Sequence, residues 1–401
     1  MTKIKLAKAS LCTGCHSCYS ICPTSSIKMT YNKYGFLQPA INHDTCIKCH
    51  LCEKACPILT PKEKSDNETL KVVSSILKDK NIRNESTSGG AFWAFASYVI
   101  SQGGVVFGAA FDGVHVRHCY TEKLEGLHAF MGSKYVQSEI GDSYKEVKKI
   151  LKGNRLVLFT GTPCQIAGLN SYLRKDYSNL LTVELLCRGV PSPKVWEKYI
   201  KEKLIELKGH EINDIRFRTK SPNYSSPVFS YVLKFSYLDV SNERKVFWED
   251  CRKNPFFSYF MNHIFRSSCY QCKYRNAYSS RTDITIGDAI SDSSFGKDTD
   301  NKVSTIVIHT RKGNDTFDRI KSNILYEEQT VLKMEKYFNN SIIAACNDMK
   351  YKLWRTSNIL ALNYPLGKIR KVYEYTYYPI SMSFFYHLKR LFISLVITIL
   401  I

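Results

Sequence analysis

The chain has 401 residues, 44% hydrophobic and 23% charged, which excludes wholesale disorder and low-complexity architecture. Its formal net charge of +21 is spread along the chain, which indicates a solvated basic surface or a docking face for an acidic partner. Nucleic-acid binding is a minor option, because the chain has no long basic run and no recognisable binding motif. Fifteen cysteines, eight of them within residues 12–56, exclude a small secreted disulfide scaffold. No secretory signal is visible, and metal-binding thiolates need a reducing compartment, so we expect a cytoplasmic protein.

Residues 1–60 are predicted to form a ferredoxin-type domain with two [4Fe-4S] clusters. Cys12–Pro23 and Cys46–Pro57 share the pattern C-x2-C-x2-C-x3-C-P. In a two-cluster ferredoxin, the first three thiolates of such a run bind one cubane and the fourth binds the other cluster. The predicted ligands are Cys12, Cys15, Cys18 and Cys56 for the first cluster, and Cys46, Cys49, Cys52 and Cys22 for the second.

Zinc is the alternative metal for these thiolates. Zinc sites usually combine two separated cysteine pairs, whereas each run here places three cysteines within seven residues before Cys-Pro, so the spacing favours iron and sulfide. His16 and His50 lie inside the two loops, and we interpret them as surface residues that tune solvent exposure. Because each cluster carries one electron, two-electron chemistry needs a further group, usually a flavin.

Residues 61–72 are polar and charged around Pro61 and are predicted to be a linker. Beyond them, short apolar strands alternate with helices, which predicts a sheet covered by helices. The predicted strands are Lys71–Leu77, Val105–Phe111, Val114–Tyr120, Arg155–Phe159, Leu180–Leu186, longer strands from Ile212 to Val246 including Phe229–Val240, Thr282–Gly287 and Val303–Thr310. The predicted helices are Gly89–Gln102, Asp142–Leu151, Gln165–Arg174 and Pro193–Leu207.

The fold class that these patterns predict is α+β and α/β, with a ferredoxin-like module followed by a large mixed α/β domain. We divide the large domain into 73–150 and 151–312, and we expect 313–401 to be a mainly helical C-terminal extension. Leu391–Ile401 is apolar but shorter than the ~20 residues that span a bilayer. It is predicted to be a docked C-terminal helix or, alternatively, an interfacial foot, without a membrane span.

Four further cysteines have settings that favour a third site. Cys164 follows a predicted strand and opens a helix, where the helix dipole favours a thiolate. Cys187 follows the next predicted strand, so both sulfurs should reach the carboxyl edge of the sheet, where open α/β sheets place ligands. Cys269 and Cys272 supply a C-x2-C pair. We expect either a third four-thiolate cluster or, alternatively, a core cysteine, a loop cysteine and a stray pair.

The remaining cysteines lack paired spacing and are interpreted as structural: Cys119, Cys251 and Cys346.

A series of ordered motifs resembles a known family: Cys12–Pro57, Ser86–Gly90, Gly132–Ser138, Gly161–Gln165, Cys187–Pro193, Cys269–Cys272 and Asp283–Asp288. Over residues 10–310, the chain resembles the coenzyme F420 hydrogenase/dehydrogenase beta-subunit family, which includes hydroxymethyl-chlorophyll reductase. The resemblance implies an oxidoreductase with FAD and iron–sulfur clusters, and a flavin-binding region over 73–150. It also implies a cluster near the flavin, with the ligands Cys164, Cys187, Cys269 and Cys272.

One position departs from the family pattern. Arg188 follows Cys187, where many members carry histidine, so a role of that histidine in proton transfer or substrate binding is in doubt here. The arginine instead favours an anionic substrate or a flavin phosphate.

The resemblance also points to residues that contact the flavin. Small residues that open a helix are predicted to offer backbone N–H groups to the pyrophosphate: Ser86, Ser88, Gly89 and Gly90. Taken alone, this stretch would indicate only an ordinary helix N-cap. Lys134 is predicted to pair with flavin O2/N1, where negative charge develops on reduction, and Tyr135 to stack or hydrogen-bond.

Lesser candidates complete the predicted flavin site. Gln137 and Ser138 follow Tyr135 in the same motif. Asp288 is a candidate for a ribityl hydroxyl or, equally, for a turn cap. Arg218 and Arg281 are weaker candidates for contact with an anion.

The sequence predicts an electron relay. Reduced ferredoxin or a redox partner subunit gives single electrons to the N-terminal clusters, which pass them through the third cluster to FAD and on to a small-molecule organic acceptor; the reverse direction is equally compatible. Three alternatives remain: a reductase of coenzyme F420, an electron-transfer subunit of a larger complex without its own substrate, and a flavin-free iron–sulfur protein with a structural or nucleic-acid-binding role.

Overall fold

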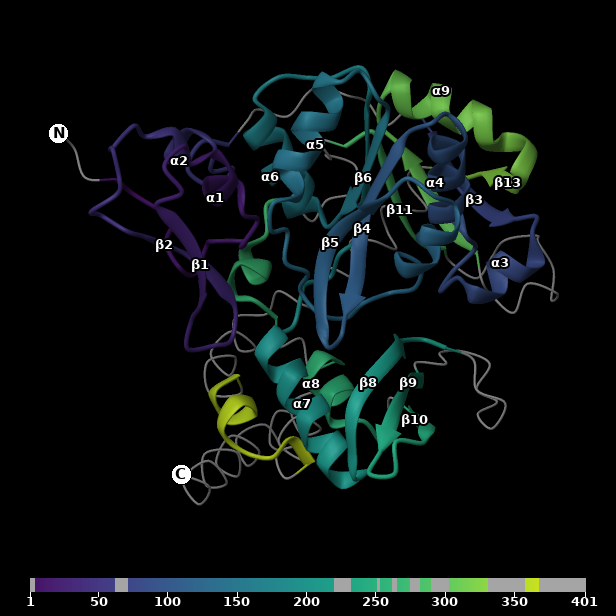
Figure 1. Ribbon diagram of the computed structural model, residues 1–401. Helices are drawn as coiled ribbons and strands as arrows, with labels where there is room; N and C mark the ends of the chain where they lie inside the picture. The colour runs from purple at the N-terminus through teal and green to yellow at the C-terminus, as the bar shows by residue number, and fades with distance from the viewer. Residues whose placement is uncertain are drawn as a thin grey trace, which may run out of the picture.

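The computed structural model describes residues 4–61, 71–219, 232–250, 253–261, 265–274, 282–289, 303–330 and 358–367. It confirms the mixed α/β class, with a cysteine-rich N-terminal module beside a large sheet (Figure 1). Within the described residues, no helix has the length and apolar character that a bilayer crossing requires. Leu391–Ile401, predicted to dock or to lie at an interface, falls outside the described residues.

The N-terminal module repeats one backbone conformation at its two cysteine runs. His16 and His50 both adopt left-handed backbone angles, with φ of 64° and 59°, and each precedes a short helix that carries the third cysteine of its run. The sequence duplication is therefore a structural duplication. The elements of the module are α1 (Ser17–Ile21), α2 (Leu51–Lys54) and an antiparallel hairpin of β1 (Ile27–Tyr31) and β2 (Leu37–Ile41).

An eight-stranded sheet forms the centre of the large domain, in the order β13-β3-β12-β11-β7-β6-β4-β5. The four neighbours β11, β7, β6 and β4 are parallel, so their carboxyl ends share one edge, and the other pairs are antiparallel. The strands are β3 (Lys71–Leu77), β4 (Val105–Asp112), β5 (His115–Thr121), β6 (Val157–Gly161), β7 (Leu180–Leu185), β11 (Ile284–Asp288), β12 (Ser304–Ile308) and β13 (Ile324–Glu328).

Helices cover both faces of this sheet (Figure 1). Successive strand residues point to opposite faces, so Val106 and Leu158 join the core under α4 and α9, while Phe107 and Phe159 join the core under α5 and α6. These helices are α3 (Lys80–Glu85), α4 (Ala91–Ser101), α5 (Ser143–Lys152), α6 (Pro163–Leu173) and α9 (Arg311–Ile320), with 3-10 turns η1 (Glu125–Ala129) and η4 (Lys321–Asn323).

A second, three-stranded antiparallel sheet packs with the segment that carries Cys269 and Cys272. Its core is aromatic, built around Trp196, Phe235 and Phe256, and it also takes in Phe36 from the N-terminal module. The elements are α7 (Pro193–Glu206), β8 (Gly209–Arg216), β9 (Val232–Asp239), β10 (Arg244–Asp250), α8 (Pro255–Met261) and η2 (Ser267–Gln271). The N-terminal module thus packs on both parts of the rest of the chain.

The mainly helical extension predicted from residue 313 stays a prediction, since residues 331–357 and 368–401 lie outside the described residues, but it includes a strand that the sequence pattern did not predict. Residues 311–320 do form α9, but residues 324–328 form strand β13, which pairs antiparallel with β3 at the edge of the large sheet. A five-residue edge strand with one apolar side gives too weak a sequence pattern to separate it from a helix. The division of the large domain at residue 150 stays a prediction. The large sheet contains strands from both sides of residue 150.

Candidate redox site

The first predicted set of cysteines lies together inside the N-terminal module. Burial raises the pKa of Cys15 to about 12, and the nearby thiols of Cys12 and Cys56 raise it as well. Burial, followed by the charges of Cys15, Cys12 and Cys56, raises the pKa of Cys18 well above its ordinary value. Cys12 and Cys15 are buried and Cys18 and Cys56 are half-buried. Four neighbouring thiolates that repel one another in this way suit a cationic iron group, because iron neutralises their charge.

The second predicted set lies nearer the surface. Cys22, Cys46, Cys49 and Cys52 line one pocket, whose other walls include Ile4, Ile27, Ile41 and Ile47. Cys49 is exposed, and Ile47 beside it is 62% exposed. The pocket brings together the four cysteines that the spacing assigns to the second cluster, and it opens toward solvent at the Ile47–Cys49 loop.

Local hydrogen bonds favour a thiolate at Cys22. Burial alone would raise its pKa, but contacts with Thr24 Oγ1 at 3.7 Å and with the donating N–H of Ser26 at 3.3 Å lower it. The N–H donor stabilises negative charge on the sulfur, as a metal-bound cysteine requires.

The third predicted set meets at the carboxyl edge of the large sheet. Burial raises the pKa of Cys164 well above its ordinary value, and the charges of Cys272, Cys187 and Cys269 each raise it further. Cys164 follows β6 in the first turn of α6, and Cys187 lies just beyond the end of the neighbouring parallel strand β7. Cys269 lies in η2, and Cys272 is the C-cap of this 3-10 turn. The fold therefore brings these four cysteines together, while their role as ligands stays a prediction.

The predicted ligand cysteines all lie in the described part of the chain, and none of them forms a disulfide there. Among the described residues, no three or more histidine, cysteine, aspartate or glutamate side chains are arranged to hold a single metal ion. A four-iron cubane binds each thiolate through a different iron, so its ligands stand farther apart than the four ligands of one ion.

Helix α6 connects the third set to the first. A Cβ atom at Gly168 would lie 2.8 Å from Cys15 Cβ and 3.0 Å from Cys15 Sγ, so the glycine lets the cysteine loop contact the helix. Gly168 is four residues after Cys164, a rise of about 6 Å along an α-helix. The two cysteine sets are therefore separated by about one helical turn.

Tyr144 lies between the same two sets. Its buried hydroxyl donates a hydrogen bond to the carbonyl of Gln165 at 2.6 Å, and a Cβ atom at Gly168 would lie 2.9 Å from this hydroxyl. Burial raises the pKa of Tyr144 well above its ordinary value, and Cys15 and Cys164 raise it further. Sequence reasoning missed both Tyr144 and Gly168, because only the packing of α5 on α6 brings them to the cysteines.

The predicted phosphate-binding loop lies against the predicted lysine loop. Ser133 N–H donates to Thr87 Oγ1 at 2.9 Å, and Ser88 Oγ donates to the carbonyl of Val303 at 2.6 Å. Gly90 is the N-cap of α4 with φ of 90° and no side-chain cap, so the first N–H groups of this helix are not satisfied by a capping side chain. A Cβ atom at Gly89 would meet the carbonyl oxygen of Ser75 at 2.3 Å, which explains why only glycine fits there.

Lys134 is held by its own loop. Its ammonium donates to the carbonyls of Phe130, Met131 and Gly132 at 3.3, 3.0 and 3.2 Å. Burial, helped by the charge of Arg216, lowers the pKa of Lys134 to about 7. Its proton is therefore easily lost or gained near neutral pH.

The other predicted flavin contacts have protein partners. The Tyr135 ring packs edge-on against Phe217, with 5.5 Å between centroids. Ser138 Oγ accepts a hydrogen bond from Gln165 Nε2 at 2.9 Å. Asp288, the candidate for a ribityl hydroxyl, forms an ion pair at 2.7 Å with Arg218, a candidate for an anion. Ser86 Oγ donates to the carbonyl of Ile82 at 3.0 Å. Arg281 lies outside the described residues.

One interpretation of a single residue changes. The surface interpretation of His16 is wrong: its ring is 2% exposed, and burial lowers its pKa to about 3. The left-handed backbone at this position turns the ring inward, against Tyr19. His50 is half-buried and pairs with Glu53 at 3.0 Å. Cys119, interpreted as structural, is exposed on edge strand β5. Cys251 and Cys346 lie outside the described residues.

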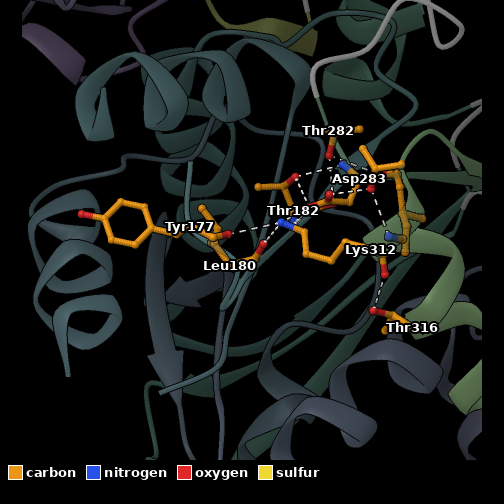
Figure 2. A network of polar contacts seen from close by, with 10 residues as sticks. Tyr177, Leu180, Thr182, Thr282, Asp283, Lys312 and Thr316 are labelled. Atoms are coloured by element: carbon orange, nitrogen blue, oxygen red, sulfur yellow. Dashed lines mark hydrogen bonds and ion pairs between the residues drawn. The ribbon is translucent and has the colours of Figure 1, made fainter. Parts of the chain in front are cut away.

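The motif residue Asp283 has a structural role. Figure 2 shows its carboxylate accepting hydrogen bonds from the N–H and hydroxyl of Thr182, both at 2.9 Å, with the Lys312 ammonium 3.2 Å away. Thr310 at the N-cap of α9 donates to the other oxygen at 2.7 Å. The network joins β7, β11 and α9 at the amino end of β11, at the opposite edge from the cysteines.

Two segments of the chain match models of known protein families. Residues 154–333 match the family model described as the C terminus of the beta subunit of coenzyme F420 hydrogenase/dehydrogenase, and residues 11–58 match the model of a 4Fe-4S dicluster domain. The predicted resemblance is confirmed over these residues. The chain is thus an iron–sulfur protein with an electron-transfer domain, joined to a domain of the kind found in hydrogenase and dehydrogenase beta subunits.

A search of the curated proteins finds no match. Among solved structures, the xenon-derivatised F420-reducing [NiFe] hydrogenase complex from Methanosarcina barkeri is similar over 70% of this chain and 92% of the matched chain, with 14% sequence identity and a TM-score of 0.42.

Proposed function

We propose that the protein is an FAD- and iron–sulfur-dependent oxidoreductase that relays single electrons from an acidic, ferredoxin-like donor through three [4Fe-4S] clusters to FAD and on to an organic acceptor. When bound, clusters carry single electrons and a flavin combines them into two-electron equivalents. The contact of Cys15 with α6 at Gly168, one turn from Cys164, carries the proposal, because it joins the dicluster domain to the sheet edge.

The cysteine sets follow one another in an order that suits a relay. The set with Cys49 is exposed, the set with Cys15 is buried against α6, and the set with Cys164 lies in the large domain. An external donor would therefore approach the exposed set first.

Charge on the N-terminal module fits an acidic donor. Its described surface lysines outnumber its acidic residues, Asp44 and Glu53, and a positive field speeds encounter with a negatively charged protein. The lysines are Lys5, Lys8, Lys28, Lys33, Lys48 and Lys54.

The flavin would lie along the same sheet edge. The glycine-capped amino end of α4 offers N–H groups and a positive dipole end to a pyrophosphate. Lys134, with its pKa near 7, holds or gives a proton at Nζ where negative charge would develop. Arg218 and Asp288, at the end of β11, are polar groups at this edge.

The test is anaerobic purification of the full chain, with flavin measured against protein and reduction followed by visible spectroscopy. We expect about one FAD per chain, and bleaching of the flavin band by reduced ferredoxin that is lost or much slower in Cys49→Ala. Protein with intact iron–sulfur absorbance and no flavin would contradict the proposal. A parallel assay with coenzyme F420 as the acceptor tests whether the organic acceptor is this deazaflavin.

A further inference from the structure

Arg266 is a buried arginine beside the first cysteine set. Its side chain is 1% exposed, and it reaches across to the N-terminal module, 254 residues away in sequence. Nε donates to the carbonyl of Cys12 at 2.7 Å, and Nη2 donates to the carbonyl of Leu37 at 2.8 Å. Nη2 also lies 3.8 Å from Cys12 Sγ, within reach of a hydrogen bond to sulfur.

The loop of the first cysteine set is shaped to admit this guanidinium. Gly14 has φ of +69°, and a Cβ atom there would lie 2.7 Å from Arg266 Nη1. Gln137 accepts from Nη1 at 3.1 Å and donates from Nε2 to the carbonyl of Thr13 at 3.0 Å, which closes the ring of contacts. Gln137, predicted as a flavin contact, therefore contacts the cysteine loop.

The backbone of Arg266 belongs to the third cysteine set. Its N–H donates to the carbonyl of Val190 at 2.9 Å, three residues after Cys187. Its carbonyl accepts from the N–H of Cys269 at 2.9 Å, in the 3-10 turn that leads to Cys272. One residue thus fixes the loop of the third set through its backbone and the loop of the first set through its side chain.

Among the residues that the structure describes, no carboxylate forms an ion pair with the Arg266 guanidinium. Its neutral partners are three oxygen acceptors and the Phe36 ring, whose centroid is 5.5 Å from Arg266 Cζ. A buried charge without a partner of opposite charge destabilises the fold. Four thiolates around an iron–sulfur group, which carry negative charge together, would supply the missing counter-charge.

We propose that Arg266 is a positioning residue that raises the reduction potential of the cluster held by Cys12, Cys15, Cys18 and Cys56 above that of the cluster at Cys49. Reduction adds one electron to the group, so a nearby positive charge and a hydrogen bond to Cys12 Sγ favour the reduced state. Electrons would then pass from the exposed set to the buried set with a favourable free energy. This inference rests on the proposed function, because it requires the clusters to be present.

The experiment is a redox titration of the anaerobically purified full chain, followed by electron paramagnetic resonance. In Arg266→Gln, we expect one cluster signal to move to a lower midpoint potential, while the others stay in place and iron per chain is retained. Arg266→Lys, which keeps the charge, should restore most of the potential. The shifted signal should be the one that disappears in Cys15→Ala and persists in Cys49→Ala.

Arg83→Gln is the matched control, because Arg83 is also buried and donates to a carbonyl, that of Leu77, at 2.7 Å. It should leave every cluster signal unchanged. Unchanged potentials in Arg266→Gln with iron intact, or the same lowered potential in Arg266→Lys, overturns the inference. If Arg266→Gln loses its iron, the inference requires that Arg266→Lys keeps it. Loss of iron from both variants overturns the inference, because packing rather than charge would then hold the cluster. Wild-type protein without clusters would instead refute the proposed function.

Discussion

At Gly168, the cysteine loop of the dicluster domain packs directly against helix α6. A methyl group in its place would overlap Cys15 and the hydroxyl of Tyr144. In Gly168→Ala, the gain in helix propensity, about 1 kcal/mol, opposes an overpacking cost of about 1–3 kcal/mol. We therefore expect the visible iron–sulfur absorbance to be lost at a lower temperature than in the wild type.

Gly367→Ala is the control for this change, since no atom of the described residues lies within 4 Å of a Cβ atom at Gly367. Its thermal midpoint should match the wild type or exceed it. A Gly168→Ala protein as stable as this control would show that the contact of Cys15 with α6 is loose.

Lys134 makes the stability of the folded protein increase with pH above neutrality. Its pKa in the folded protein, about 7, is below the ordinary value of 10.5, so the unfolded chain binds more protons between these two pH values. Stability contributed by this residue should therefore rise as pH increases from 7 toward 10. Thermal midpoints over this range should rise more steeply for the wild type than for Lys134→Met.

Lys149, an exposed lysine on α5, gives the matched variant Lys149→Met, whose profile should follow the wild type. Parallel profiles for wild type and Lys134→Met would mean that Lys134 keeps its proton in the folded protein at all these pH values.

At the scale of elements, the Asp283 network fixes α9 to the two central strands. The Asp283→Asn substitution removes the negative charge that pairs with Lys312. It also replaces one acceptor oxygen by an amide NH2 group, which would face the donors of Thr182 or Thr310. We expect a loss of about 1–3 kcal/mol in the free energy of unfolding, measured by denaturant titration of the apoprotein. Asp318→Asn, an exposed carboxylate on the same helix, should cost less than about 0.5 kcal/mol. Equal effects of the two variants would contradict the structural role of Asp283.

Elements with a strong local pattern could be predicted from the sequence. Apolar strands such as 180–185 and the helix after Pro163 were recognisable, because burial on both faces and a proline at the first helical position leave local signals. The two cysteine runs were equally readable from spacing. Strand β13 was not, because its pairing with β3 joins segments about 250 residues apart.

The parts of the site that depend on long-range packing stayed hidden for the same reason. Arg266 contacts Cys12 across 254 residues, and Tyr144 reaches Cys15 only through the docking of α5 and α6. The inward turn of His16 depends on its backbone angle, which residue type does not reveal.

At the scale of the whole molecule, three cysteine sets lie in one order from the exposed Cys49 loop to the sheet edge at Cys164. The module that carries the first two sets packs against α6, and its Phe36 joins the core beside the second sheet. An arrangement held by two separate contacts, Gly168 and Arg266, keeps the sets in fixed relation to each other.

Iron and acid-labile sulfide per chain, measured in anaerobically purified wild type and Cys164→Ala, test whether three sets of cysteines hold three clusters. We expect about twelve irons in the wild type and about eight in the variant, which keeps the dicluster domain. About eight irons in both proteins, or stoichiometric zinc in place of iron, would contradict this expectation.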